Sequence, residues 1–347
     1  MKKVFADIFE KWLASEEGEG FWGVFSAKNA EGVIYQRALG YRCRKKELEN
    51  QLDTSFGIAS GTKLFTGLSV CKLVDQGKLS LDDKIWNILG KDLGRVNKSI
   101  TIRHLLTHTS GVGDYVDEEW EDFDEKMEEL RKKYPVNLWT NLDYYLQMIT
   151  PLPPKFEPGE RYGYSNSGFI LLGLAVEAVS GISYQRYVQE NIIEPLGMVH
   201  TGFYNMTQLP ENVAIGYMVD EDTGEFTENT DIMSVIGGSD GGIFSTADDL
   251  DALWRGIFAH KILSADMTEN FLKAHVTIDE EEGESYGLGS FRYDEDGGKV
   301  LHFGVGFDSG VGFSTAYHPK TATTITATSN NEVWPFDLIA EAFQKLG

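Results

Sequence analysis

Cysteine is scarce in this sequence of 347 residues, which contains Cys43 and Cys71 and no others. Two thiols so far apart in the chain provide neither a disulfide framework nor a zinc site, and we expect both to be ordinary reduced side chains. The seven histidines include no H-E-x-x-H motif, so a metallohydrolase is the least favoured kind of enzyme. The sequence therefore predicts no metal and no cofactor.

Long apolar runs are also missing. No stretch approaches the ~18 apolar residues that a membrane-spanning helix needs. Residues 1–13 place apolar side chains on one helical face and charged ones on the other, without the unbroken apolar core and small-residue cleavage site of a secretory signal. We therefore expect a cytoplasmic protein with no membrane span.

Basic residues are outnumbered by acidic ones, 31 to 54, which gives a formal net charge of -23 and a pI near 4.7. Such a chain is repelled by a phosphate backbone or an anionic lipid surface. Nucleic acid and membrane surfaces are thus excluded as favoured partners.

What is present is ordinary globular composition: 41% of the residues are hydrophobic, enough for a sizeable core. An amphipathic helix over 1–13 precedes two strand-like stretches, 21–27 and 32–41, which a short polar turn joins into a hairpin. A long helix follows over 59–76, and Gly77 stands where a helix end favours a left-handed residue.

Strands and helices are unevenly distributed along the chain. The pattern predicts helices over 102–106, 142–149, 167–179 and 184–193, strands over 286–292, 299–303, 310–318 and 322–329, and a closing helix over 337–346. Strands at both ends with helices between them favour an α+β fold, with one antiparallel sheet made from both termini, terminal helices beside it, and an inserted all-helical region. We place the sheet domain at 1–75 and 235–347, the helical domain at 76–234, and the active site at their junction.

The segment 117–129 is unusually acidic, although it also contains Trp120, Phe123 and Met127. It is either an interaction arm or lid, or a solvated helix whose few apolar residues hold it on the body. The second interpretation is favoured because charge runs are usually solvated faces.

The first candidate catalytic element is the S-x-x-K motif Ser60-Gly61-Thr62-Lys63, at the entrance of the long helix. Residues at i and i+3 share a helical face, so the Lys63 amine can reach the Ser60 hydroxyl. Burial and the helix N-terminus both disfavour a positive charge there, which would let Lys63 act as a base. A second S-x-x-K, starting at Ser69, lies in mid-helix without free N–H groups for an oxyanion, and we interpret it as structural.

A turn-rich loop offers Tyr164 and Asn166 two residues apart, ahead of an apolar helix. Tyr164 could pass a proton between nucleophile and leaving group if neighbouring cations lower its pKa, and Asn166 could orient Lys63 or a substrate amide. The alternative is a packed tyrosine and a helix-capping asparagine. A third element, His302-Phe303-Gly304-Val305, lies on a late strand, and the H-x-G beginning at His200 competes with it.

These three elements, in this order and spacing, resemble those of class C β-lactamases, penicillin-binding proteins, D-alanyl-D-alanine carboxypeptidases and their esterase relatives. Further stretches similar to family signatures are found at 79–83, 100–111, 197–201 and 241–250. The resemblance implies a β-lactamase/transpeptidase-like fold and a serine hydrolase that forms an acyl-enzyme with a small ester, amide or peptide.

By the same resemblance, Ser60, Lys63 and Tyr164 are the catalytic residues and the third element is the one at His302. It also implies that Asn166, His302, Gly304 and Val305 bind substrate, with the N–H groups of Ser60 and Val305 forming the oxyanion hole.

Two features depart from the family pattern. His302-Phe303-Gly304 replaces the usual Lys-Thr-Gly, which removes a cation and a hydroxyl that would bind a substrate carboxylate, and the insertion over 113–150 is long and acidic. We therefore expect neutral esters to be better substrates than carboxylate-bearing amides, with His302 reading the charge near its reference pKa of about 6.5. A true β-lactam-hydrolysing protein and a catalytically silent binding protein remain the alternatives.

Overall fold

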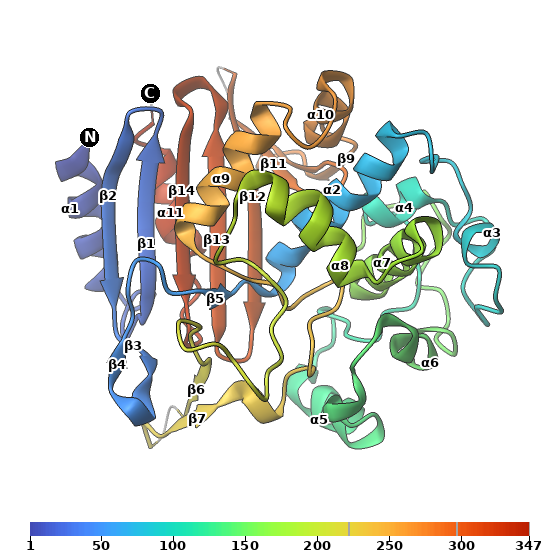
Figure 1. Ribbon diagram of the computed structural model, residues 1–347, viewed down its shortest axis with the longest axis horizontal. Helices are drawn as coiled ribbons and strands as arrows, with labels where there is room; N and C mark the ends of the chain where they lie inside the picture. Colours follow the sequence, from blue (N-terminus) through green and yellow to red (C-terminus); the bar gives the residue numbers. More distant parts are fainter. Residues whose placement is uncertain (221–222, 296–297, 347) are drawn as a thin grey trace.

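The computed structural model describes residues 1–220, 223–295 and 298–346. Both ends of the chain contribute to one eight-stranded antiparallel sheet with the order β2-β1-β14-β13-β12-β11-β10-β9 (Figure 1). Its strands are β1 (Gly23–Asn29), β2 (Gly32–Leu39), β9 (Val276–Asp279), β10 (Glu284–Tyr286), β11 (Phe291–Glu295), β12 (Lys299–Asp308), β13 (Val311–His318) and β14 (Thr323–Ser329). The predicted sheet from both termini is confirmed, with β1 paired along β14.

The two terminal helices, α1 (Lys2–Leu13) and α11 (Phe336–Phe343), pack side by side on one face of this sheet. The apolar face of α1 is buried against the strands, and the Phe9 ring stacks on Phe25 at a centroid distance of 5.0 Å. Phe303 and Phe343 belong to the same apolar cluster. Apolar burial on this face therefore joins the first and last helices of the chain.

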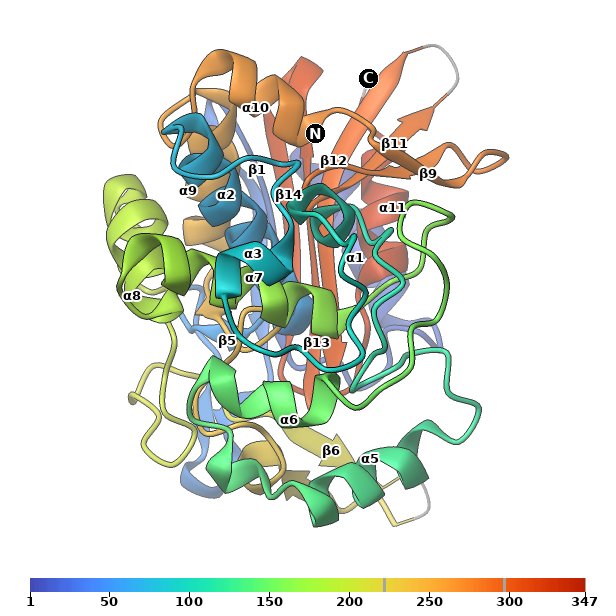
Figure 2. The ribbon, with the colours of Figure 1, turned by 90° about the vertical axis from the view of Figure 1, so that its right-hand side faces the viewer.

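The opposite face is covered by α2 (Thr62–Asp75) and α9 (Ala247–Phe258), with the helical region beyond them (Figure 1). That region contains α3 (Ile85–Leu89), α4 (Ile102–Leu106), α5 (Phe123–Lys133), α6 (Leu146–Ile149), α7 (Asn166–Ser180) and α8 (Tyr184–Val188), and α10 (Ala265–Leu272) follows α9. The centre of its core is α7, whose residues 166–176 are all buried. By contrast α5 has no buried residue and lies at the margin of the region, below α6 in Figure 2.

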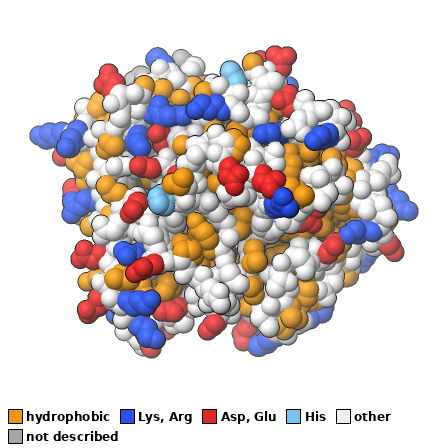
Figure 3. All heavy atoms as spheres, viewed as in Figure 1, with side chains coloured by type: hydrophobic (Ala, Val, Ile, Leu, Met, Phe, Trp, Pro, Cys, Tyr) orange, Lys and Arg blue, Asp and Glu red, His pale blue; other side chains and the backbone are white. Residues whose placement is uncertain are grey.

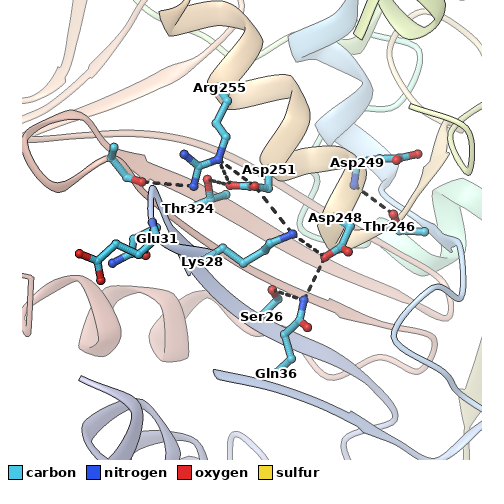
Figure 4. Close-up of polar contacts among 12 residues, drawn as sticks. Ser26, Lys28, Glu31, Gln36, Thr246, Asp248, Asp249, Asp251, Arg255 and Thr324 are labelled. Atoms are coloured by element: carbon cyan, nitrogen blue, oxygen red, sulfur yellow. Dashed lines mark hydrogen bonds and ion pairs between the residues drawn. The ribbon is translucent and has the colours of Figure 1, made fainter. Parts of the chain in front are cut away.

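Hydrogen bonds and an ion pair connect α9 to the sheet (Figure 4). Asp251 on α9 accepts hydrogen bonds from Arg255 at 2.9 Å and from Thr324 on β14 at 2.6 Å. Lys28 on β1 forms an ion pair with Asp248 at 3.1 Å. Because Asp251 is largely buried, these partners satisfy a carboxylate that would otherwise be costly to desolvate.

The predicted elements recur with shifted bounds. The long predicted helix starts as a 3-10 turn, Ala59–Gly61, before α2, and Gly77 has a φ of 68° as expected for a helix end. The strand predicted over 286–292 is divided: Tyr286 ends β10, residues 287–290 form a turn, and Phe291 begins β11. The inserted region also contains a short hairpin, β6 (Tyr217–Val219) with β7 (Phe226–Glu228).

The remaining short strands pair β3 (Tyr41–Cys43) with β4 (Leu48–Glu49), and β5 (Phe56–Gly57) with β8 (Phe244–Ser245). The β5–β8 pair matters for the site, because it fixes the segment that leads into Ser60 against the segment that follows Gly242.

Candidate active site

Ser60 lies in the 3-10 turn Ala59–Gly61, which continues directly into α2. The preceding residue, Ala59, has a φ of 41°, in the left-handed region that residues with a side chain seldom adopt. Backbone strain of this kind is concentrated at functional sites. Ser60 stands in the first turn of a helix, where the first N–H groups have no carbonyl four residues earlier in the helix. The Gly61 N–H is already bonded to the Ile58 carbonyl at 2.8 Å, so the Ser60 N–H is the candidate oxyanion donor.

Lys63 is buried next to this serine, with 2% of its surface exposed. Its Nζ lies 2.9 Å from Ser60 Oγ, 2.8 Å from Asn166 Oδ1 and 2.8 Å from the Asp240 carbonyl oxygen. Burial lowers the pKa of this amine, while the negative charge of Asp240, followed by other carboxylates, acts in the opposite direction.

The three acceptors decide what this amine can do. An ammonium group donates three hydrogen bonds and can satisfy all three contacts at once. After loss of one proton, two N–H groups remain for Asn166 and Asp240, and the lone pair can face the Ser60 hydroxyl. The geometry therefore accommodates both protonation states, as a residue that takes a proton from Ser60 and later returns it must do.

Tyr164 contacts the same serine through a hydrogen bond between its hydroxyl and the Ser60 side chain. Its ring lies 4.8 Å from Lys63 Nζ. Burial, and then the negative charge of Glu118, raise the pKa of Tyr164 well above its ordinary value. The condition attached to Tyr164 in the sequence, a pKa lowered by neighbouring cations, is therefore not met, because burial has the largest effect and the Glu118 charge adds to it. Tyr164 is therefore protonated at neutral pH and has a proton that it can transfer.

His108 positions this tyrosine, although the sequence did not single it out as a site residue. Its ring stacks on the Tyr164 ring at 4.4 Å between centroids, and its Nδ1 accepts a hydrogen bond from the Ser165 N–H at 3.0 Å. Burial lowers the pKa of His108 well below its ordinary value, so the ring is neutral and able to accept this bond. His108 lies in the stretch 100–111 that resembles a family signature, but nothing in that stretch predicts its contact with Tyr164, which depends on the fold.

Asn166 is the first residue of α7, and its Nδ2 donates to the Val116 carbonyl at 2.9 Å. Asp114 caps the same helix end, because its two carboxylate oxygens accept the N–H groups of Asn166 and Ser167, each at 2.8 Å. Burial raises the pKa of Asp114 to about 7 despite these bonds. Asn166 thus bonds Lys63 as the sequence suggested, while the capping is done by Asp114 and by Ser165, whose Oγ accepts the Gly168 N–H at 3.0 Å.

The third element, residues 302–305 on β12, contributes to the site only in part. His302 lies on β12 between Arg292 and Tyr317 of the neighbouring strands, is 4% exposed, and packs its ring 5.5 Å from that of Phe258. Burial lowers the pKa of His302 to about 3. Phe303 points to the other side of the sheet, into the core under α1 and α11. We expected His302 to contact the substrate and respond to its charge, but in the structure His302 is buried and its neighbour Phe303 faces the other side of the sheet.

Further along β12, the strand meets the serine turn. A Cβ built on Gly306 would lie 2.2 Å from the Ile58 carbonyl oxygen and 2.8 Å from Ser60 N, and one on Gly304 would lie 2.6 Å from the Leu64 side chain. Small residues here let the strand backbone approach the nucleophile. From Gly304 onward the described part of β11 no longer pairs with β12, so Val305 lies where one edge of the strand is open.

Comparison with known proteins identifies the family and supports the fold. The Beta-lactamase family model matches residues 28–346. The chain belongs to this family. Penicillin-binding protein 4* of Bacillus subtilis (strain 168) is 28% identical over 284 residues, 79% of this chain but 60% of its own length, so the chain spans less than two thirds of that relative.

Solved structures extend the likeness over nearly the whole chain. A penicillin-binding protein from Bacillus halodurans is 36% identical with a TM-score of 0.88, covering 97% of this chain and 98% of its own. A D-stereospecific amidohydrolase from Streptomyces sp. has a TM-score of 0.82 at 23% identity, covering 97% of each chain, a likeness that shows the fold alone.

In this Beta-lactamase family member, Ser60, Tyr164, Asn166 and Val305 line one cavity of ≈ 810 Å³. Lys63 lies buried behind Ser60, and neither His302 nor Gly304 is part of the cavity wall. The competing Ser69 is buried in mid-helix and donates to the Phe65 carbonyl at 2.7 Å, as a structural serine would.

The acidic segment also reaches this cavity. Glu118, Phe123, Asp124 and Met127 contribute to its wall, together with Arg131 from the last turns of α5. The favoured expectation of a merely solvated helix is therefore incomplete, because one side of the segment borders the space in front of Ser60.

In the described ranges, no group of three or more His, Cys, Asp or Glu side chains is arranged to hold a metal ion. Nor is any single helix among those residues long and apolar enough to cross a membrane. The bent pair Asn166–Ser180 and Tyr184–Leu196 passes the same test by length and composition alone, and residues 166–176 of that pair are buried.

Proposed function

We propose that this chain is a serine hydrolase that cleaves esters or amides through a covalent acyl-enzyme on Ser60. The observation that carries the proposal is the contact of one hydroxyl with two proton-handling groups: Ser60 Oγ bonds both the Lys63 amine, at 2.9 Å, and the Tyr164 phenol. A nucleophile with a positioned base at its side is the usual arrangement for acyl transfer.

In the first step, Ser60 Oγ forms a bond to the carbonyl carbon of the substrate while its proton moves to the neutral Lys63 Nζ. The carbonyl oxygen becomes an oxyanion, for which the Ser60 and Val305 N–H groups are the donors we propose. When the tetrahedral intermediate collapses, the bond to the leaving group breaks, and that group takes the Tyr164 proton, which the Lys63 ammonium replaces. Water then repeats the sequence on the acyl-enzyme and frees Ser60.

A second candidate, binding or hydrolysis of β-lactams, is supported by the 36% identity with a penicillin-binding protein. It is opposed by the acidic cavity wall, since penicillins carry a carboxylate. Simple esters and amides without a negative charge fit the site better.

One panel of assays tests both candidates. The purified chain is given chromogenic esters, D-alanyl anilides and a chromogenic cephalosporin, and is labelled separately with a fluorophosphonate followed by peptide mapping. We expect ester or amide turnover and one adduct on Ser60, both absent in Ser60→Ala. A silent binding protein would show neither turnover nor adduct, and a β-lactam enzyme would favour the cephalosporin.

A further inference from the structure

The cavity in front of Ser60 is unbalanced in charge. The charged side chains in its wall are five carboxylates and one guanidinium: Glu118, Asp124, Asp240, Asp308 and Glu332, with Arg131. On the outer face seen in Figure 3, by contrast, basic and acidic side chains are interspersed. The cavity is therefore more uniformly negative than that surface.

Three of these carboxylates act directly on the reacting groups. The charges of Asp240, Glu118 and Asp308 all raise the pKa of Lys63, which places them within electrostatic reach of the amine that bonds Ser60. Asp308 in turn has its own pKa raised, by burial and then by the neighbouring charges of Asp240 and Glu118, against the lowering effect of Arg131. This wall lacks enough positive charge of its own to balance its carboxylates.

Two aromatic side chains stand in the same wall. Phe307 is 52% exposed and Trp334 48% exposed, and their rings lie 6.2 Å apart. Two neighbouring exposed rings form an apolar patch, and apolar patches of this kind often mark ligand-binding grooves. Aromatic faces attract cations, and quaternary ammonium groups are recognised by combining such faces with negative charge.

We propose that this cavity selects substrates whose acyl part carries a positive charge, an ammonium or quaternary ammonium group, facing Glu118 and Asp308 with its alkyl groups against Phe307 and Trp334. This deepens the proposed function and rests on it. It assigns charge selectivity to the cavity wall in place of His302, which lies outside it.

The kinetic test uses three 4-nitrophenyl esters with acyl chains of equal length: a trimethylammonio-butanoate, its neutral tert-butyl isostere, and the hydrogen glutarate with a free carboxylate. We expect kcat/KM to fall in the order cationic, neutral, anionic, with at least about tenfold between the first two, as for one unit charge near a carboxylate at a partly solvated site. Raising the sodium chloride concentration from about 20 mM to about 500 mM should shrink that ratio, because salt screens the wall charges.

Variants locate the effect. Glu118→Gln and Asp308→Asn should each reduce the cationic-to-neutral ratio several-fold, since each removes one negative charge. Glu121→Gln is the matched control, because Glu121 belongs to the same acidic segment but not to the cavity wall, and it should leave the ratio as in the wild type. Equal kcat/KM values for the three esters, or a higher kcat/KM for the carboxylate ester, would overturn the inference while leaving Ser60 chemistry intact.

A binding measurement keeps the two proposals separable. In Ser60→Ala, benzyltrimethylammonium should quench tryptophan fluorescence saturably through Trp334, more weakly after Glu118→Gln, and benzoate should not. If no ester is turned over and Ser60 takes no adduct, but this binding is seen, the proposed function fails and the cation site stands. If benzyltrimethylammonium binds no better than benzoate, the cation site is wrong, whether or not Ser60 turns over esters.

Discussion

The Asp240 carbonyl oxygen lies 2.8 Å from Lys63 Nζ, while the carboxylate of the same residue accepts the Tyr115 hydroxyl at 2.5 Å. Backbone and side chain of Asp240 thus have separate tasks. The carbonyl orients the amine that bonds Ser60, and the buried charge acts on that amine from close by. Burial raises the pKa of Asp240 itself, with the positive charge of Lys63 acting in the opposite direction.

This relationship predicts how activity depends on pH. Lys63 must be neutral to take the Ser60 proton, so kcat/KM should rise as the pH passes through its pKa, which burial places below the ordinary lysine value of 10.5. Asp240→Asn removes a negative charge that raises this pKa but keeps the carbonyl and an acceptor for Tyr115. We therefore expect the rising limb of the kcat/KM profile to move to lower pH.

Asp266→Asn is the control for this shift, since Asp266 is an exposed carboxylate on α10, away from the cavity wall. A limb that stays in place in Asp240→Asn, or moves to higher pH, would show that this charge does not set the protonation of Lys63.

Tyr164→Phe tests the phenol. The variant keeps the ring that stacks on His108 but loses the hydroxyl that bonds Ser60. We expect kcat to fall by about 10² to 10⁴, the usual loss for a general acid or base, with little change in the free energy of unfolding. Steady-state kinetics and denaturant unfolding of the same preparation measure both, and near-normal turnover would assign Tyr164 a packing role.

Gly306 and Gly304 form a matched pair for the proposed oxyanion hole. In Gly306→Ala the new methyl group would press on Ser60 N and the Ile58 carbonyl, both backbone atoms, whereas in Gly304→Ala it would meet the Leu64 side chain. Loss of one oxyanion donor costs about 10² to 10³ in kcat, so Gly306→Ala should fall in that range and Gly304→Ala should lose much less. Similar kcat values for the two variants would argue against this placement of the hole.

His302 should influence stability and not substrate charge. Its folded pKa is depressed from 6.5 to about 3, so between these values the unfolded chain binds a proton that the native state does not. The free energy of unfolding contributed by this residue is therefore fully present above pH 6.5 and is lost as the pH falls toward 3. We expect His302→Gln to flatten this acid dependence in denaturant titrations.

The same residue provides a check on specificity. The cationic-to-anionic selectivity measured from about pH 5.5 to about pH 8.5, which brackets the reference histidine pKa, should not follow a titration near 6.5. His302→Lys should destabilise the fold, because it buries a cation near Arg292, and should not improve KM for the carboxylate ester. An improved KM in that variant would return His302 to the substrate-binding role suggested by its sequence position.

The order of elements could be derived from the sequence because it depends on local patterns. The helical spacing of residues 1–13, the hairpin around residues 28–31 and the apolar run of α7 each have a period that the neighbouring residues alone determine. The prediction of one strand over 286–292 was wrong because it also relied on the local pattern alone. Gly287 and Gly289 lie in a turn between two short strands, but the apolar residues on either side resemble a continuous strand.

Within the site, the sequence determined the residues that are fixed by short-range geometry. Ser60 and Lys63 are one helical turn apart, so their contact follows from the helix itself. The contact of Lys63 with Asn166 followed only in part, because it spans 103 residues and the sequence left open whether Asn166 orients Lys63 or a substrate amide.

Tertiary structure decided the electrostatics. Whether Tyr164 is surrounded by cations or carboxylates, whether His302 faces substrate or Phe258, and whether the acidic segment borders the cavity all depend on segments distant in the chain. Side-chain types and spacing carry no information about burial, or about the charges and hydrogen-bond partners that folding brings near, and these set the pKa values in the site. The sequence by itself therefore determined which groups can react, and the packing of the sheet against the helical region decided their protonation and the charge of the space in front of them.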